Sequence, residues 1–265
     1  MKLYDKMNNR LAMFGEKALA EFWDEHWQVG DFEKKVRSGA NNLIIKSFIA
    51  KFLKPGLRVL EGGCGMGQIV YGLKSWGYDA YGVDWAKETI KKIKENFPEL
   101  KVFIQDVRKL DFPDSFFDGY LSLGVIEHFW EGYDEILQEM KRVIKPESYL
   151  FISFPWMSPL RKFKAHRGLY RTLDEEEINL NNFYQFVLDE STVVRSLGKN
   201  GFRLIKRHPS DATKGLKDEI FFLNPILRRI YRSQSFLAKG MRLAISLLFS
   251  KVAGHTILLV FQKEK

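Results

Sequence analysis

The segment VLEGGCGMGQ, residues 59–68, predicts a tight turn between a buried strand and a helix. Residues 57–60 before it form a short apolar strand pattern, and residues 69–73 after it begin a helical pattern. Glycines at 62, 63, 65 and 67 allow the backbone to approach a ligand closely. The first amides of the helix then point at that ligand. The segment therefore predicts a ligand site where this strand ends, beside the acidic residue Glu61.

Strand and helix patterns alternate beyond this turn. This alternation predicts an α/β fold of the Rossmann-like kind, with a mostly parallel sheet, helices on both faces and right-handed crossovers. We expect helices at 40–53, 86–97, 133–144 and 189–199, and strands at 57–60, 79–83, 100–105, 118–125, 149–154, 202–207 and 255–262.

Four acidic residues fall at the ends of predicted strands, namely Glu61, Asp84, Asp106 and Glu127. Ligands of parallel sheets bind at the carboxyl ends of the strands, where the strand order reverses. An acid about 20 residues after the glycines suits hydrogen bonds to a ribose diol, and Asp84 follows Gly67 at that distance. We expect the four acids to meet at one edge of the sheet.

Composition narrows the functional classes. The single cysteine, Cys64, excludes a disulfide framework and a multi-cysteine zinc site, and fits a reducing compartment. The first residues lack an apolar signal core, and no uncharged apolar run approaches the ~18 residues of a membrane span. These features predict a cytoplasmic protein. Residues 201–265 hold 13 Lys and Arg against 4 Asp and Glu, so the whole net charge of +9 lies there. Localised positive charge indicates an anionic partner.

We expect one domain over residues 1–265 with three elaborations. Residues 1–40 are predicted to form an N-terminal helical flap, helical over 3–29 and rich in aromatic residues, with packing on the core as the alternative. Residues 155–187 are expected to form a lid. Residues 209–254 read as two basic amphipathic helices that cover the sheet or pocket, or that contact an anionic membrane peripherally.

The segment Glu61-x-Gly63-x-Gly65-x-Gly67, with Asp84, Asp106-Val107 and residues 125–129, resembles the class I S-adenosylmethionine-dependent methyltransferases. The match is to the small-molecule branch that includes ubiquinone and menaquinone biosynthesis enzymes. It covers about 41–207 and 255–265 and departs from the family at the insertion before the last strand. The resemblance implies a seven-stranded sheet whose last strand is antiparallel.

The resemblance also implies the cofactor S-adenosylmethionine, the product S-adenosylhomocysteine and no metal. Asp84 would take the ribose hydroxyls and Asp106 the adenine amine. Arg37 is a further candidate, for a ligand carboxylate, with a solvated arginine as the alternative. The other expected cofactor-binding residues are Glu61, Gly62, Gly63, Gly65, Gly67, Gln68, Trp85, Val107 and Leu123.

Methyl transfer mainly needs the acceptor held in line with the methyl group, and a base helps when the acceptor is a hydroxyl or an acidic carbon. His128, with an unperturbed pKa near ~6.5, is the first candidate base, with a packing or capping role as the alternative. His166 is the second candidate. We expect a small-molecule or lipid-like acceptor.

Three other functions share some of these sequence features. A nicotinamide dehydrogenase fits less well, because Gln68 stands where its fingerprint requires glycine or alanine. The basic tail suggests a nucleic-acid methyltransferase, but residues 122–125 lack the Asn/Asp-Pro-Pro-aromatic segment of the enzymes that methylate adenine amines. A non-catalytic module that binds S-adenosylmethionine is the third alternative.

Overall fold

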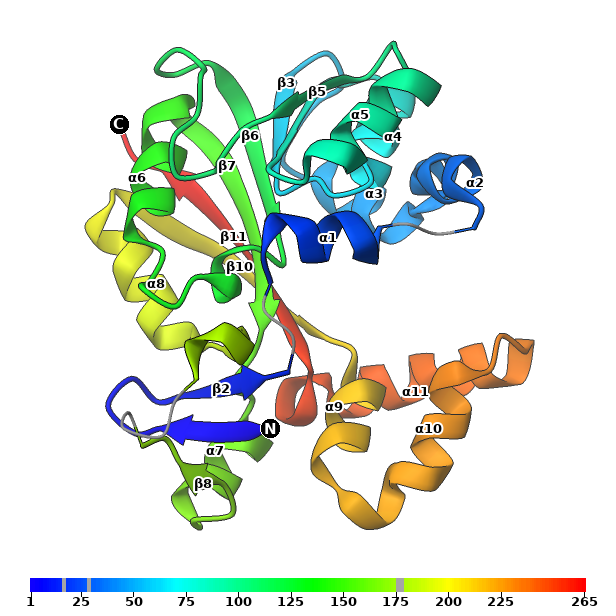
Figure 1. The fold of residues 1–265 in the computed structure, drawn as a ribbon, viewed down its shortest axis with the longest axis vertical. Helices are drawn as coiled ribbons and strands as arrows, with labels where there is room; N and C mark the ends of the chain where they lie inside the picture. The colour runs from blue at the N-terminus through cyan, green and yellow to red at the C-terminus, as the bar shows by residue number, and fades with distance from the viewer. Residues whose placement is uncertain (16–17, 28–29, 175–178) are drawn as a thin grey trace.

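A computed structural model describes residues 1–265 except 16–17, 28–29 and 175–178. Its centre is the expected seven-stranded sheet, in the order β10-β11-β7-β6-β3-β4-β5 (Figure 1). Only β11 is antiparallel to its neighbours, β7 and β10. The strands are β3 (Arg58–Gly62), β4 (Asp79–Asp84), β5 (Lys101–Ile104), β6 (Phe117–Leu123), β7 (Ile144–Pro155), β10 (Phe202–Ser210) and β11 (Thr256–Lys263). The predicted fold class is confirmed.

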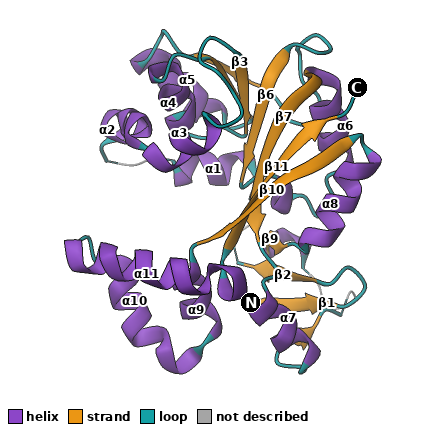
Figure 2. Cartoon of the chain, turned by 180° about the vertical axis from the view of Figure 1, so that it is seen from behind, coloured by secondary structure: helices purple, strands orange, loops and turns teal. Residues whose placement is uncertain are grey.

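Helices cover both faces of this sheet and divide the core into two layers (Figure 2). One layer packs α6 and α8 on the sheet, and the other packs α2 to α5. The helices are α1 (Ala20–His26), α2 (Phe32–Arg37), α3 (Leu43–Ile49), α4 (Gln68–Ser75), α5 (Lys87–Asn96), α6 (Asp134–Val143), α7 (Pro159–His166) and α8 (Glu190–Lys199). The order of the strands reverses at β3, which pairs with both β4 and β6.

A second sheet of four strands replaces part of the helix expected over 3–29, so that prediction is wrong for residues 3–14. Its order is β8-β1-β2-β9. Asp5 accepts hydrogen bonds from Asn8 and Arg10, and Asn9 has a φ of 48°, so the chain reverses into a hairpin. Long-range pairing with β9 then overrides the local helical spacing. The strands are β1 (Lys2–Asp5), β2 (Arg10–Phe14), β8 (Arg171–Thr172) and β9 (Phe183–Val187).

The described residues of 155–187 largely form regular secondary structure, namely α7, β8 and β9. These elements lie on the side of the small sheet. Residues 174–177 form an acidic block, and all of it except Asp174 lies outside the described residues. The basic insertion holds three helices rather than the expected two: α9 (Ala212–Glu219), α10 (Asn224–Arg232) and α11 (Phe236–Ala253). Among the described helices, none is long and apolar enough to cross a membrane.

Candidate active site

The glycine turn between β3 and α4 forms one wall of a cavity of about 350 Å³. Gly63, Gly65 and Gly67 have φ angles of 73°, 48° and 74°, in the left-handed region that favours glycine. A Cβ on Gly63 would lie 2.5 Å from a methyl of Val125, and one on Gly65 would lie 3.0 Å from the Trp27 indole. Side chains at these positions would fill the cavity edge, so the backbone itself is the surface offered to a ligand.

Two of the expected glycines do not line the cavity. A Cβ on Gly62 would lie 2.0 Å from the hydroxyl of Tyr120, so this glycine is required for packing. Gly67 is the N-cap of α4. Their part in ligand binding is indirect, through the shape of the turn.

Asp84, at the end of β4, orients the same turn. Its two carboxylate oxygens accept hydrogen bonds from the backbone N–H of Gly65 (2.8 Å) and of Ala86 (3.0 Å). Burial raises the pKa of Asp84 even though these hydrogen bonds oppose the shift. Each oxygen keeps a further lone pair, so a ligand hydroxyl has an acceptor there.

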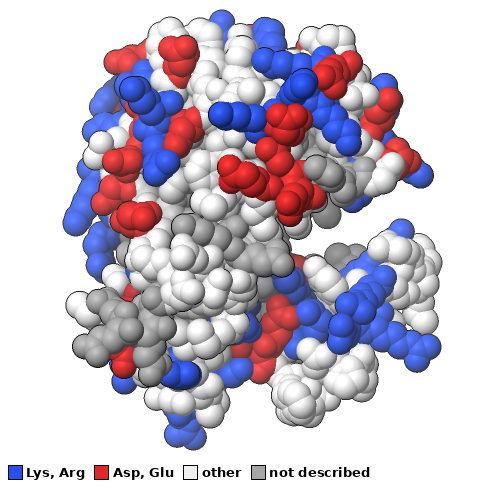
Figure 3. Space-filling model, in the orientation of Figure 1, with Lys and Arg blue, Asp and Glu red and all other residues white. Residues whose placement is uncertain are grey.

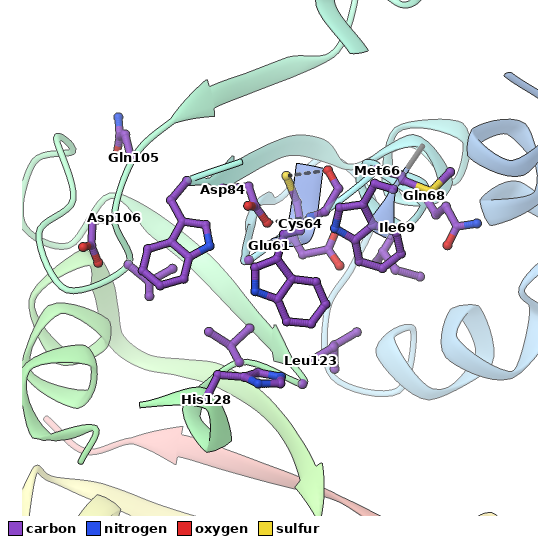
Figure 4. Close-up of a pocket in the computed structure, with 18 of the residues that line it drawn as sticks. Glu61, Cys64, Met66, Gln68, Ile69, Asp84, Gln105, Asp106, Leu123 and His128 are labelled. Carbon is purple, nitrogen blue, oxygen red and sulfur yellow. Dashed lines mark hydrogen bonds between the residues drawn. The ribbon is translucent and has the colours of Figure 1, made fainter. Parts of the chain in front are cut away.

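Asp106 lies at the opposite end of the cavity from Gln68, with Gln105 beside it (Figure 4). Burial raises the pKa of Asp106, but hydrogen bonds from the side chain and backbone N–H of Arg108 outweigh burial and hold the pKa below its ordinary value. The Arg108 guanidinium is paired with both carboxylate oxygens, at 2.6 and 3.1 Å. Asp106 therefore stays a charged acceptor.

Three of the four strand-end acids line the cavity, namely Glu61, Asp84 and Asp106. Glu127 follows β6 at the same edge of the sheet but does not line the cavity. Glu61 and Glu127 are buried, and one carboxyl oxygen of each has no hydrogen-bond partner among the described residues. Burial raises the pKa of Glu61 well above its ordinary value, and that of Glu127 to about 8.

His128 lines the cavity, and its tautomer follows from one contact. Its Nδ1 lies 2.7 Å from the carbonyl oxygen of Tyr184. A carbonyl only accepts, so Nδ1 carries the hydrogen and Nε2 holds a free lone pair. Burial lowers the pKa of His128 to about 4, partly offset by the Tyr184 hydrogen bond. This pKa lies below the unperturbed value near ~6.5, because the ring is desolvated against β9 and α1.

Aromatic side chains of α1 complete the cavity. Trp23 packs edge-on against the His128 ring, with centroids 5.0 Å apart, and Trp27 closes over Gly65. Neither tryptophan was predicted as a site residue, although the aromatic segment they belong to was noted as a flap. α1 has no buried residue of its own. Asp24 attaches it to α5 by accepting hydrogen bonds from the N–H and hydroxyl of Thr89, both at 2.8 Å.

Arg37 lies outside the cavity. Its guanidinium donates to the Tyr71 hydroxyl at 3.4 Å, pairs with Glu33 at 3.6 Å, and is more than half exposed. The structure thus places Arg37 on the surface, and the prediction of a ligand contact is not supported by its position. Gln68 does line the cavity, and its amide donates to the backbone carbonyl of Lys35.

The remaining predicted residues line the cavity, namely Trp85, Val107 and Leu123. Residues that sequence reasoning missed are Ile45, Cys64, Met66, Ile69, Gln105, Gly124, Val125 and Phe129, in addition to the two tryptophans. Most of them neighbour a predicted residue in the chain, which is the signal that could have found them. None of the described residues of 155–187 lines the cavity, so the expected lid lies beside it.

Comparison with known proteins connects this geometry to a family. Residues 60–152 match the family described as "Methyltransferase domain". A probable S-adenosylmethionine-dependent methyltransferase of Mycobacterium tuberculosis is 27% identical over 123 residues, which are 45% of this chain and 44% of the relative. The cyclopropane-fatty-acyl-phospholipid synthase of Escherichia coli is 36% identical over 105 residues, 38% of this chain and 26% of that protein.

The chain thus spans less than half the length of these curated relatives. A solved structure of a Pyrococcus horikoshii protein is similar in fold, with a TM-score of 0.57 and 20% identity, over 91% of this chain and 99% of that chain. That likeness shows the fold alone. A specific place in the ubiquinone and menaquinone branch stays a prediction.

Proposed function

Because the chain belongs to the class I S-adenosylmethionine-dependent methyltransferases, we propose that it transfers a methyl group from S-adenosylmethionine to a small-molecule or lipid-like acceptor. The observation that carries this proposal is the cavity at the carboxyl ends of β3, β4 and β6. The wall of this cavity contains a glycine turn that leaves no room for side chains. It also contains the carboxylates of Asp84 and Asp106.

The donor set fits this cofactor. The Asp84 carboxylate suits a ribose diol, and Asp106 at the far end suits the adenine amine. The glycine turn and Gln68 would then face the methionine end, where the backbone must come close. The volume of about 350 Å³ lies within the range of small-ligand pockets. The same fit holds for the product, S-adenosylhomocysteine. The expectation that no metal is used stays a proposal.

The bound cofactor supplies an already activated methyl group on its sulfonium. The chain's own residues then need only to hold the acceptor in line and exclude water. Trp23 and Trp27 cover the cavity on the α1 side and keep it apolar. The Nε2 lone pair of His128 is available to accept a proton from the acceptor. With a pKa of about 4, His128 suits an acceptor that loses its proton readily.

Three observations support a small or lipid-like acceptor. The cavity wall near His128 is apolar, formed by Leu123, Val125 and Phe129. A second cavity of about 490 Å³ is lined in part by Phe14, Phe22 and Tyr184, and Tyr184 contacts His128. One relative is named for a fatty-acyl phospholipid. A cytoplasmic location is part of the proposal.

The test is incubation with methyl-labelled S-adenosylmethionine and cell extract, followed by partition into lipid, small-molecule and macromolecular fractions. We expect label in the lipid or small-molecule fraction. Label in nucleic acid would favour the nucleic-acid alternative, for which no observation at the site speaks. Binding of the cofactor without transfer to any fraction would instead indicate a binding module. Absence of binding in calorimetry would refute the proposal.

A further inference from the structure

The helices α9, α10 and α11, residues 212–253, form an arm that projects away from the large sheet (Figures 1 and 2). The arm joins the body through β10 and β11, which flank it in the chain. Figure 3 shows the molecule hollowed between the arm and the body above it. The arm leaves a large part of its surface without a protein neighbour among the described residues.

The outward face of α11 is largely apolar, the reverse of a helix that faces water, and Lys251 near the end of the helix is the charged residue on it. Of its 18 residues only Ala238 and Ala253 are buried. At 100° per residue these two lie on one side of the helix. The opposite side carries large apolar side chains, with exposed fractions of 92% for Phe236, 63% for Leu243, 77% for Leu247 and 73% for Leu248. A patch of this kind marks an interaction surface.

The net charge of residues 220–253 indicates the charge of the partner. Residues 220–253 contain six Lys and Arg and no Asp or Glu. Arg242 is used within the arm, because its guanidinium donates to three backbone carbonyls at the end of α10. Three arginines of α10, at 228, 229 and 232, are exposed. Figure 3 shows Lys and Arg gathered on the arm beside surface that carries no charged residue. The surface therefore suits a partner that is both anionic and apolar.

The arm is held firmly to the body at its base. Glu219, at the end of α9, is buried and accepts from Arg161 (3.0 Å), Lys164 (2.8 Å), Lys2 (3.0 Å) and the Tyr170 hydroxyl (2.6 Å). Removing one partner of a buried charge cluster is strongly destabilising. This cluster anchors the base of the arm to the body.

We propose that the arm docks the protein on an anionic phospholipid membrane, with the outward face of α11 among the acyl chains and the α10 arginines at the headgroup phosphates. The proposed function, methyl transfer, supplies only the purpose of docking, which is access to a lipid-like acceptor; the docking itself stands on the arm alone.

Other occupants fit the same surface less well. A second copy would bring its own cations to the interface, and like charges repel. Nucleic acid would satisfy the arginines but would leave the α11 leucines in water, because its affinity comes mainly from phosphate contacts. A bilayer with anionic headgroups satisfies both features at once.

The test is co-sedimentation of the full chain with vesicles of phosphatidylcholine alone, or mixed with phosphatidylglycerol, at low and at high salt. We expect binding to the anionic vesicles only, weakened by salt. The triple change Arg228→Ser, Arg229→Ser, Arg232→Ser should lower the partition coefficient roughly 100-fold. Leu243→Ser, Leu247→Ser, Leu248→Ser should lower it at least about tenfold.

A matched control removes the same charge elsewhere, through Lys87→Ser, Lys91→Ser, Lys94→Ser on the exposed side of α5. This control should keep most of the binding. Equal losses in the α5 and α10 triples would overturn the proposal, and so would a chain that stays in the supernatant with anionic vesicles at low salt. Self-association in sedimentation velocity without vesicle binding, or nucleic-acid binding without vesicle binding, would also overturn it. Calorimetric binding of S-adenosylmethionine to each variant reports separately on the proposed function.

Discussion

Replacing Glu127 by Gln should stabilise the free protein at neutral pH. The Glu127 carboxyl is 3% exposed, and its Oε2 has no hydrogen-bond partner among the described residues. Burial raises its pKa from 4.5 to about 8. A raised pKa means that the folded state binds a proton that the unfolded state has already lost. Gln is neutral in both states and has nearly the same shape, so Glu127→Gln removes this difference.

The sign and size follow from linkage. The stability associated with protonated Glu127 is fully present below the unfolded pKa of 4.5 and is lost as the pH rises to the folded pKa of about 8. Each pH unit between these limits costs about 1.4 kcal/mol. At pH 7 the free energy of unfolding is therefore lower by roughly 3 kcal/mol than it would be with Glu127 protonated in both states, and above pH 8 by roughly 5 kcal/mol. Glu127→Gln should regain these amounts.

Urea unfolding followed by tryptophan fluorescence, at pH 5, 7 and 8.5 without cofactor, measures the difference. The gain in the free energy of unfolding should be small at pH 5 and should grow with pH. A gain that is absent at pH 7, or that does not change with pH, would refute the reasoning about desolvation.

Glu139→Gln is a control of opposite sign. The Glu139 carboxylate accepts two hydrogen bonds from Arg142 and one from the backbone N–H of Leu110, all at 2.7 Å. Hydrogen bonds from Arg142 lower the pKa of Glu139. Its stabilisation is present above the unfolded pKa and is lost as the pH falls. Glu139→Gln should therefore destabilise the protein at pH 7, and the difference should shrink in acid.

Three further predictions concern the site and the turn. Asp84→Ala should weaken binding of S-adenosylmethionine by about 2–4 kcal/mol in calorimetry, while Asp79→Ala at the far end of the same strand should not; unchanged affinity in the first variant would count against the ribose assignment. His128→Ala should lower turnover about 10²-fold with cofactor affinity nearly intact, and His166→Ala should not; since burial lowers the pKa of His128 to about 4, the pH–rate profile should show no step near pH 6.5 from this group, and such a step would contradict the assigned state. Gly39→Ala should cost about 2–3 kcal/mol in urea unfolding, because Gly39 lies in the 3-10 turn Ser38–Asn41 after α2 and a Cβ there would lie 1.7 Å from the first carbonyl oxygen of α4; an unchanged midpoint would show that this 3-10 turn can move away from α4.

Much of the fold was predictable because its signals are local. The expected seven strands are all present, with boundaries shifted by a few residues, except that β7 begins at Ile144, five residues earlier than expected. The glycine turn and the acids that follow β4 and β5 lie where predicted, because parallel strands place their carboxyl ends at one edge. These features depend on the spacing of apolar side chains and on the conformational freedom of glycine, and both can be read from short stretches of the sequence.

The tertiary structure decided the rest. Residues 2–14 carry helical spacing yet pair with β9, which is more than 160 residues away. The lowered pKa of His128 and the carboxyl oxygen of Glu127 that lacks a hydrogen bond both result from burial by distant elements. Desolvation of this kind cannot be read from the residue type. The outward face of α11 is likewise a tertiary result. The sequence by itself determined the sheet, the glycine turn and three of the acids at the cavity. Long-range pairing and burial determined how those groups are charged, what covers them and which apolar face is left open.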